Sequence, residues 1–124
     1  MDYKYIQLEI LESVSEGDPE IVREIVDIFK TQSNEIYEEM KALLSEKNYE
    51  ALGLLAHKAK SSVAIMGIAD LVTMLKTLEI QARKGLETEN FKSYIERFKT
   101  EIDASLIELE DLIMNMSSVD DDKD

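Results

Sequence analysis

Apolar residues recur at steps of three and four along most of this chain, which is the periodicity of an amphipathic α-helix. Four long stretches follow this pattern, at about residues 19–46, 48–67, 69–85 and 89–116, and a shorter one covers residues 3–14. The chain has only four Gly and one Pro, too few for the tight turns that join the strands of a sheet. The pattern therefore predicts an all-α fold.

The residues at the ends of these stretches are typical of helix termini. In Gly17-Asp18-Pro19, Asp18 is placed to cap a helix that begins at Pro19, where the missing N–H is harmless. Asn48 is a candidate cap for the next helix, which we expect to stop at Gly67. Arg83-Lys84-Gly85 combines a basic last turn with a Gly C-cap. The helix boundaries are thus encoded locally.

Short connections between long helices make consecutive helices antiparallel neighbours. The sequence predicts an antiparallel up-down-up-down four-helix bundle over residues 1–116, with the short extra N-terminal helix lying across one end. Residues 117–124 include four Asp, and we expect them to form a disordered acidic tail. Two acidic clusters within the helices are expected to face solvent: Glu35/Glu38/Glu39 and Glu108/Glu110/Asp111.

Composition narrows the classes of function. The chain has 27 Asp and Glu against 14 Lys and Arg, and this net charge of −13 argues against nucleic acid or an anionic membrane as partner. No stretch approaches the roughly 20 apolar residues of a membrane-spanning helix. Because there is no Cys, thiol chemistry is excluded and a cytoplasmic location is expected. A single His cannot supply the Glu-x-x-His pairs of a di-metal bundle, so no metal site is expected.

One segment departs from the general acidity. Residues 51–69 contain no Asp or Glu, although simple proportion would place about four there. The segment carries His57, the only His of the chain, together with Lys58 and Lys60. At about 100° per residue, His57 projects off the apolar stripe of its helix. It is therefore expected to be exposed, either as a reactive group or as an ordinary surface side chain.

The residues around His57 favour approach by another molecule. Gly53 lies one turn earlier in a helix interior, where Gly costs roughly 0.5–1 kcal/mol relative to Ala, so a compensating use is expected. We interpret the small neighbours of His57 as clearance for a partner, with Leu54 and two Ile as apolar contacts at the border. The predicted docking residues are Gly53, Lys58, Ser61, Ala64, Ile65 and Ile68.

The segment His57-Lys58-Ala59-Lys60-Ser61-Ser62 resembles the signature of histidine-containing phosphotransfer (HPt) domains. In that signature a His is followed by a Lys three residues later, then by small residues and by a Gly ten after the His, which here is Gly67. Leu71 and Leu78 match its downstream apolar positions, and the resemblance extends roughly from residue 6 to residue 116. Ser61 stands where many members have Gly, which implies slightly less clearance.

This resemblance implies that His57 accepts a phosphoryl group from the aspartyl phosphate of a receiver domain and passes it to another receiver. It implies that Lys60 offsets negative charge and that Glu79, 22 residues after the His, accepts a hydrogen bond from the imidazole Nδ1–H. The acid cluster and Mg²⁺ would belong to the receiver, so no cofactor of this chain is expected. The chain has no phosphate-binding loop, so it should not act as a kinase. A non-catalytic helical interaction module is the alternative.

Overall fold

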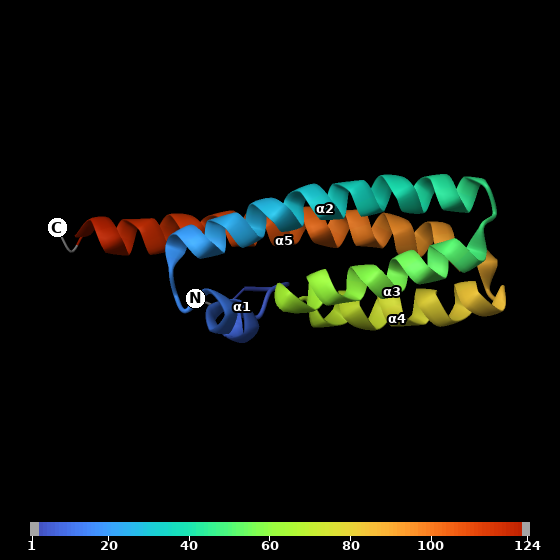
Figure 1. Ribbon diagram of the computed structural model, residues 1–124, viewed down its shortest axis with the longest axis horizontal. Coiled ribbons are helices and arrows are strands. Elements are labelled where there is room, and N and C mark those ends of the chain that lie inside the picture. The colour runs from blue at the N-terminus through green and yellow to red at the C-terminus, as the bar shows by residue number, and fades with distance from the viewer. Residues whose placement is uncertain (1–2, 123–124) are drawn as a thin grey trace.

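The computed structural model describes the backbone of residues 3–122 and the side chains of residues 3–116. The described residues form α1 (Leu8–Ser15), α2 (Pro19–Ser45), α3 (Tyr49–Ile65), α4 (Ala69–Lys84), the 3-10 turn η1 (Thr88–Asn90) and α5 (Phe91–Asp122). In Figure 1, α2 lies beside α5, and α3 lies beside α4 in a second layer. Consecutive long helices run in opposite directions, and α1 lies at the end of the bundle where α3 joins α4. The predicted all-α antiparallel bundle is confirmed.

Local capping sets the helix boundaries as the sequence predicts. The Asp18 side chain accepts a hydrogen bond from the Glu20 backbone N–H at 2.9 Å. The Asn48 side chain accepts one from the Ala51 N–H at 3.3 Å. Gly85 has a φ of +64°, the left-handed conformation of a helix C-cap. Asp18 and Asn48 thus begin α2 and α3, and Gly85 ends α4.

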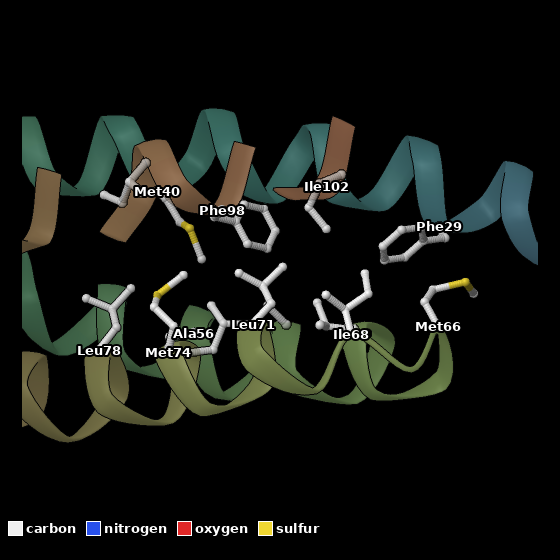
Figure 2. Close-up of a cluster of buried hydrophobic side chains, with 14 of the residues drawn as sticks. Phe29, Met40, Ala56, Met66, Ile68, Leu71, Met74, Leu78, Phe98 and Ile102 are labelled. Carbon is white, nitrogen blue, oxygen red and sulfur yellow. The ribbon is translucent and has the colours of Figure 1, made fainter. Parts of the chain in front are cut away.

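The core fills the space between the two layers of helices. Figure 2 shows Phe29 and Met40 of α2 and Phe98 of α5 facing Leu71 and Leu78 of α4, and all five side chains are buried. Burying a side chain of this size stabilises a protein by about 1.5–3 kcal/mol. This core holds α3 and α4 against the α2/α5 layer, with the outer sides of α3 and α4 free for other contacts.

The N-terminal segment differs from its predicted pattern. Ile10 and Val14, whose spacing contributes to the predicted short helix, are about half exposed, and Leu11 is the one apolar side chain of α1 that is fully covered. Ile6 is buried although it lies before the helix. The helix has only eight residues, so only a narrow face of it reaches the bundle. The chain before α1 supplies the remaining contact.

Acidic side chains of α5 hold that N-terminal segment in place. The Glu108 carboxylate accepts hydrogen bonds from the backbone N–H groups of Lys4, Tyr5 and Ile6 at 3.0 to 3.1 Å. The Asp111 carboxylate accepts one from the Tyr3 hydroxyl at 3.0 Å, and burial and this hydrogen bond raise the pKa of Tyr3. The expectation of a solvent-facing cluster thus holds for Glu110 and Asp111, which are exposed, and is wrong for Glu108, which is half-buried against the N-terminal segment.

The last helix is longer than the periodicity predicts. Apolar spacing ends at Met116, whereas α5 continues to Asp122. Six of the eight residues assigned to a disordered tail are thus helical in backbone, while Lys123 and Asp124 lie outside the described residues. The division into a bundle over 1–116 and a solvated tail over 117–124 stays a prediction for the side chains.

Two glycines with the same backbone conformation allow a test of how the N-terminal segment packs. Gly17 and Gly67 both have φ of +74°, but an added Cβ meets nothing at Gly17 and overlaps the backbone O and N of Gln7 at Gly67. We expect Gly17→Ala to cost about 1 kcal/mol and Gly67→Ala about 2–4 kcal/mol of unfolding free energy. Urea unfolding of both variants measures this, and equal costs would contradict the packing.

Candidate functional site

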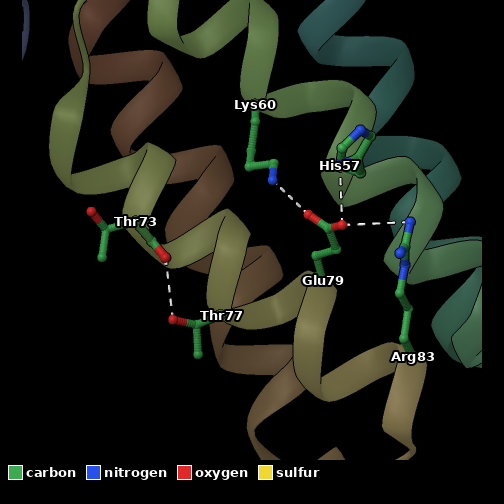
Figure 3. A network of polar contacts seen from close by, with 6 residues as sticks. All are labelled: His57, Lys60, Thr73, Thr77, Glu79 and Arg83. Carbon is green, nitrogen blue, oxygen red and sulfur yellow. Dashed lines mark hydrogen bonds and ion pairs between the residues drawn. The ribbon is translucent and has the colours of Figure 1, made fainter.

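His57 and Glu79 face each other across the two helices that pack most extensively, α3 and α4. The imidazole Nδ1 lies 3.0 Å from Glu79 Oε2, and Figure 3 shows the carboxylate between the two helices. The His57 side chain is 59% exposed, whereas that of Glu79 is 11% exposed. One ring nitrogen is therefore engaged by a buried carboxylate, and the other edge of the ring is open to an incoming group.

Gly53 permits this geometry. It is buried on α3, and a Cβ there would lie 3.0 Å from Arg83 Cγ and 3.1 Å from the Glu79 carbonyl oxygen. A larger residue would push α4 away and carry Glu79 with it. The expectation that Gly53 is exposed and clears space for a partner is wrong, because the surface that approaches it belongs to α4 of the same chain.

Three side chains converge on the Glu79 carboxylate. Lys60 Nζ lies 2.6 Å from Oε1, and Arg83 Nη2 lies 3.4 Å from Oε2, the oxygen that also contacts His57 (Figure 3). The hydrogen bond from Lys60 is the largest cause that lowers the pKa of Glu79; burial opposes it, and His57 acts in the same direction as Lys60. The carboxylate therefore stays ionised, and charge-assisted contacts of this kind are stronger than neutral ones.

Arg83 is a member of the site that the sequence reasoning did not identify. The sequence predicts Arg83 as part of the basic last turn of its helix, and its position in α4 agrees with that role. The signal that points to the site is its spacing, because a residue four after Glu79 lies one turn along the same helix face.

The predicted docking residues separate into two groups. Lys58, Ser61 and Ile65 are exposed on α3, and Ala64 is half-buried beside them. Ile68 is 1% exposed, so its assignment to the docking surface is wrong. The chain turns at Gly67 and directs Ile68 between the two layers, where Figure 2 shows it with Phe29.

An apolar groove lies beside the exposed residues of α3. It has a volume of about 170 Å³ and is lined by residues of α2 and of the end of α3: Ile25, Ile28, Phe29, Gln32, Ser62, Ile65 and Met66. Ile28, which belongs to α2, is 56% exposed. This groove and the imidazole are both accessible to a partner that approaches the bundle from the side of α3.

Two kinds of feature are absent from the part of the chain that the structure describes. No three or more His, Asp or Glu side chains there are grouped so that they could hold a metal ion. No helix there combines the length and the apolar character that crossing a membrane requires. The polar chemistry of the site is that of one imidazole, one carboxylate and two cations.

The ion pairs of Glu79 make a pH-dependent contribution to stability. Since folding lowers the pKa of this carboxyl, the contribution is fully present above its unfolded pKa and is lost as the pH falls through the lower folded value. We expect Glu79→Gln to cost about 1–3 kcal/mol at pH 7 and progressively less below about pH 4. Urea unfolding at several pH values measures this.

The matched control is Glu38→Gln, which removes an exposed pair with Lys41 and should cost less than about 0.5 kcal/mol. A Glu79→Gln cost that stays constant down to pH 3 would contradict the account of the Glu79 contacts.

The chain is similar to known proteins in sequence and in fold. A curated relative, the phosphorelay intermediate protein YPD1 of Candida albicans, is 27% identical over 94 residues, which cover 76% of this chain and 50% of the relative. The chain thus spans about half the length of that relative. The crystal structure of histidine-containing phosphotransfer protein B (HptB) from Pseudomonas aeruginosa PAO1 has the same fold, with a TM-score of 0.82, 24% identity and coverage of 92% of this chain and 98% of that one. The family model described as Hpt domain matches residues 24–113, and the chain belongs to this family.

Proposed function

We propose that this chain is a phosphorelay intermediate whose His57 receives a phosphoryl group from the aspartyl phosphate of one receiver domain and passes it to another. The observation that carries the proposal is the exposed imidazole with its Nδ1 held 3.0 Å from a buried carboxylate. With Nδ1–H donating to Glu79, the lone pair of Nε2 is free to attack phosphorus. Family membership, established over residues 24–113, supports the same role.

The transfer step balances within the two proteins. The Nε2 lone pair forms a bond to phosphorus while the bond from phosphorus to the receiver's aspartyl oxygen breaks, and the electron pair leaves with that carboxylate. The imidazole gains positive charge, and the adjacent Glu79 carboxylate stabilises it. Transfer onward reverses these bonds at a second receiver. Because phosphoryl transfer depends mainly on alignment and charge, a fixed imidazole is the main requirement on this chain.

Lys60 is proposed to offset the charge of the phosphoryl group. Its ammonium group contacts Glu79 Oε1, one helical turn from His57, and its side chain is 23% exposed. Transfer to the imidazole would bring a second anion near this cation, and Arg83, 3.4 Å from Glu79 in this structure, would balance the carboxylate. After phosphorylation, Lys60 would thus neutralise charge on the phosphoryl group while Arg83 neutralises the Glu79 carboxylate.

The proposed partners and setting follow from the same chemistry. We propose that a receiver domain docks on Lys58, Ser61, Ala64 and Ile65 of α3 and reaches Ile28 across the apolar groove. The receiver would supply Mg²⁺, so the chain acts as a carrier without a cofactor or a kinase activity of its own. We propose the cytoplasm as the location, in keeping with a chain that has no Cys.

Phosphorylation of His57 is the direct test. Incubation with phosphorylated receiver domains from the same genome should attach an acid-labile phosphoryl group to His57, as detected by mass spectrometry. His57→Gln should fold normally and stay unlabelled, because the exposed imidazole contributes little to the core. Incubation with ATP and no partner should leave the wild type unlabelled. Labelling of the Gln variant would overturn the assignment of His57 as the acceptor, and a wild type that no phosphorylated receiver labels would favour a non-catalytic interaction module.

Two substitutions separate the hydrogen bond that Glu79 accepts from its negative charge. Glu79→Ala should slow single-turnover transfer about tenfold, which corresponds to about 1.4 kcal/mol of barrier. Glu79→Gln should lose less, because the amide oxygen still accepts a hydrogen bond from Nδ1–H. Glu38→Ala, which changes an exposed carboxylate elsewhere on the bundle, should transfer at the wild-type rate. A Glu79→Ala variant that transfers as fast as the wild type would remove Glu79 from the mechanism.

A further inference from the structure

The charge of this protein is divided between two parts of the fold. Residues 51–86, which form most of α3 and all of α4, contain five Lys and Arg against two acids, a net charge of +3. The remaining residues contain nine Lys and Arg against 25 acids, a net charge of −16. We call the former segment the α3/α4 hairpin. In Figure 1 it forms one layer of the bundle, so one side of the molecule is cationic relative to the rest.

Both helices of the hairpin carry cations close in sequence to His57 or to its partner Glu79. Lys58 is adjacent to His57 on α3, and Lys60 lies one turn further along the same helix. On α4, Lys76 lies about one turn before Glu79, and Arg83 and Lys84 lie about one turn after it. Lys58, Lys76 and Lys84 are exposed. A molecule that reaches the imidazole therefore meets positive charge on both helices.

These exposed cations are not neutralised locally. Among the described residues, neither Lys58, Lys76 nor Lys84 forms an ion pair, and the only hairpin carboxylate near His57, that of Glu79, is already shared. On α2 and α5, Lys41, Arg97 and Lys99 each pair with an acid one turn away on the same helix, and both helices carry more acids than Lys and Arg. The hairpin thus retains a positive field that the other helices lack.

We propose that Lys76 and Lys84 of α4, with Lys58 of α3, form a cationic docking ridge that steers a receiver domain with an acidic rim around its aspartyl site onto His57. The inference rests on the proposed function and adds the outer face of α4 to its docking surface. A protein with a net charge of −13 otherwise repels an acidic partner, so a local positive face both permits encounter and fixes its orientation. Ile80, 44% exposed between Lys76 and Lys84, supplies an apolar contact within the ridge.

The test compares two double variants with the same change of net charge. Lys76→Glu/Lys84→Glu removes the ridge on α4, whereas Lys30→Glu/Lys92→Glu changes two exposed Lys on α2 and α5. The second-order rate of transfer from a receiver domain, phosphorylated with acetyl phosphate, is measured from low salt to about 0.5 M salt. A Glu at position 84 would also interact unfavourably with the helix dipole at the end of α4. The single variant Lys76→Glu, in the middle of the helix, avoids this effect and is therefore measured as well.

We expect Lys76→Glu/Lys84→Glu, the ridge variant, to slow transfer about tenfold at low ionic strength. At about 0.5 M salt the slowing should be less than twofold, because salt then screens charge–charge interactions beyond a few ångströms. The rate at saturating receiver should not change, and Lys30→Glu/Lys92→Glu should stay within twofold of the wild type. Equal slowing by both double variants would assign the effect to net charge, and no slowing by either would place docking elsewhere; each result overturns the ridge.

Binding separates this proposal from the proposed function. Titration of the unphosphorylated receiver domain into each variant should rank the binding affinities in the same order as the transfer rates, even if no phosphoryl group is transferred. A wild type that fails to be phosphorylated yet binds the receiver through Lys76 and Lys84 would refute the phosphorelay role and keep the ridge. Binding of the wild type to phosphatidylserine vesicles, lost in the ridge variant, would assign the ridge to a membrane and overturn the receiver as its partner.

Discussion

The ionised carboxylate of Glu79 is the constraint on which the site depends. A carboxylate in this largely covered position is stable only if its oxygens are matched by donors, and here Lys60, His57 and Arg83 supply them from two helices. Those donors can converge because α3 and α4 approach closely at Gly53. The orientation of a mostly exposed imidazole is thus determined by packing and charge beneath it, and the surface above it stays open.

The remainder of the fold supports this arrangement at a distance. The buried face of α4, with Leu71 and Leu78, sets its position against the α2/α5 layer. At the turn between α3 and α4, Gly67 packs against the backbone of Gln7, and Glu108 holds the residues just before it. The N-terminal segment therefore closes the end of the hairpin opposite to Gly53, and both ends of the α3/α4 pair are fixed by contacts that a glycine makes possible.

The sequence predicted the local features well and the contacts between helices poorly. Caps such as Asp18 and Gly85 depend on neighbouring residues, and apolar spacing reports a helix face, so helix ends and the core could be anticipated. Gly53 was recognised as a site of close approach, but a single sequence does not state which surface approaches. The same limit applies to Ile68, which a turn directs inward, and to Glu108, whose backbone partners lie about 100 residues away. The sequence does not single out Arg83, because a basic residue in the last turn of a helix is already favoured by the helix dipole.

The central claim is that Glu79 fixes the imidazole so that Nδ1 carries the proton and Nε2 is free. Long-range proton–nitrogen correlation spectra of the nitrogen-15-labelled protein, recorded at a pH where the His57 imidazole is neutral, report the tautomer directly because this chain has a single His. The account predicts the Nδ1–H tautomer in the wild type and a mixture of tautomers in Glu79→Ala. A dominant Nε2–H tautomer in the wild type, or a tautomer that the Glu79 substitution leaves unchanged, would contradict it.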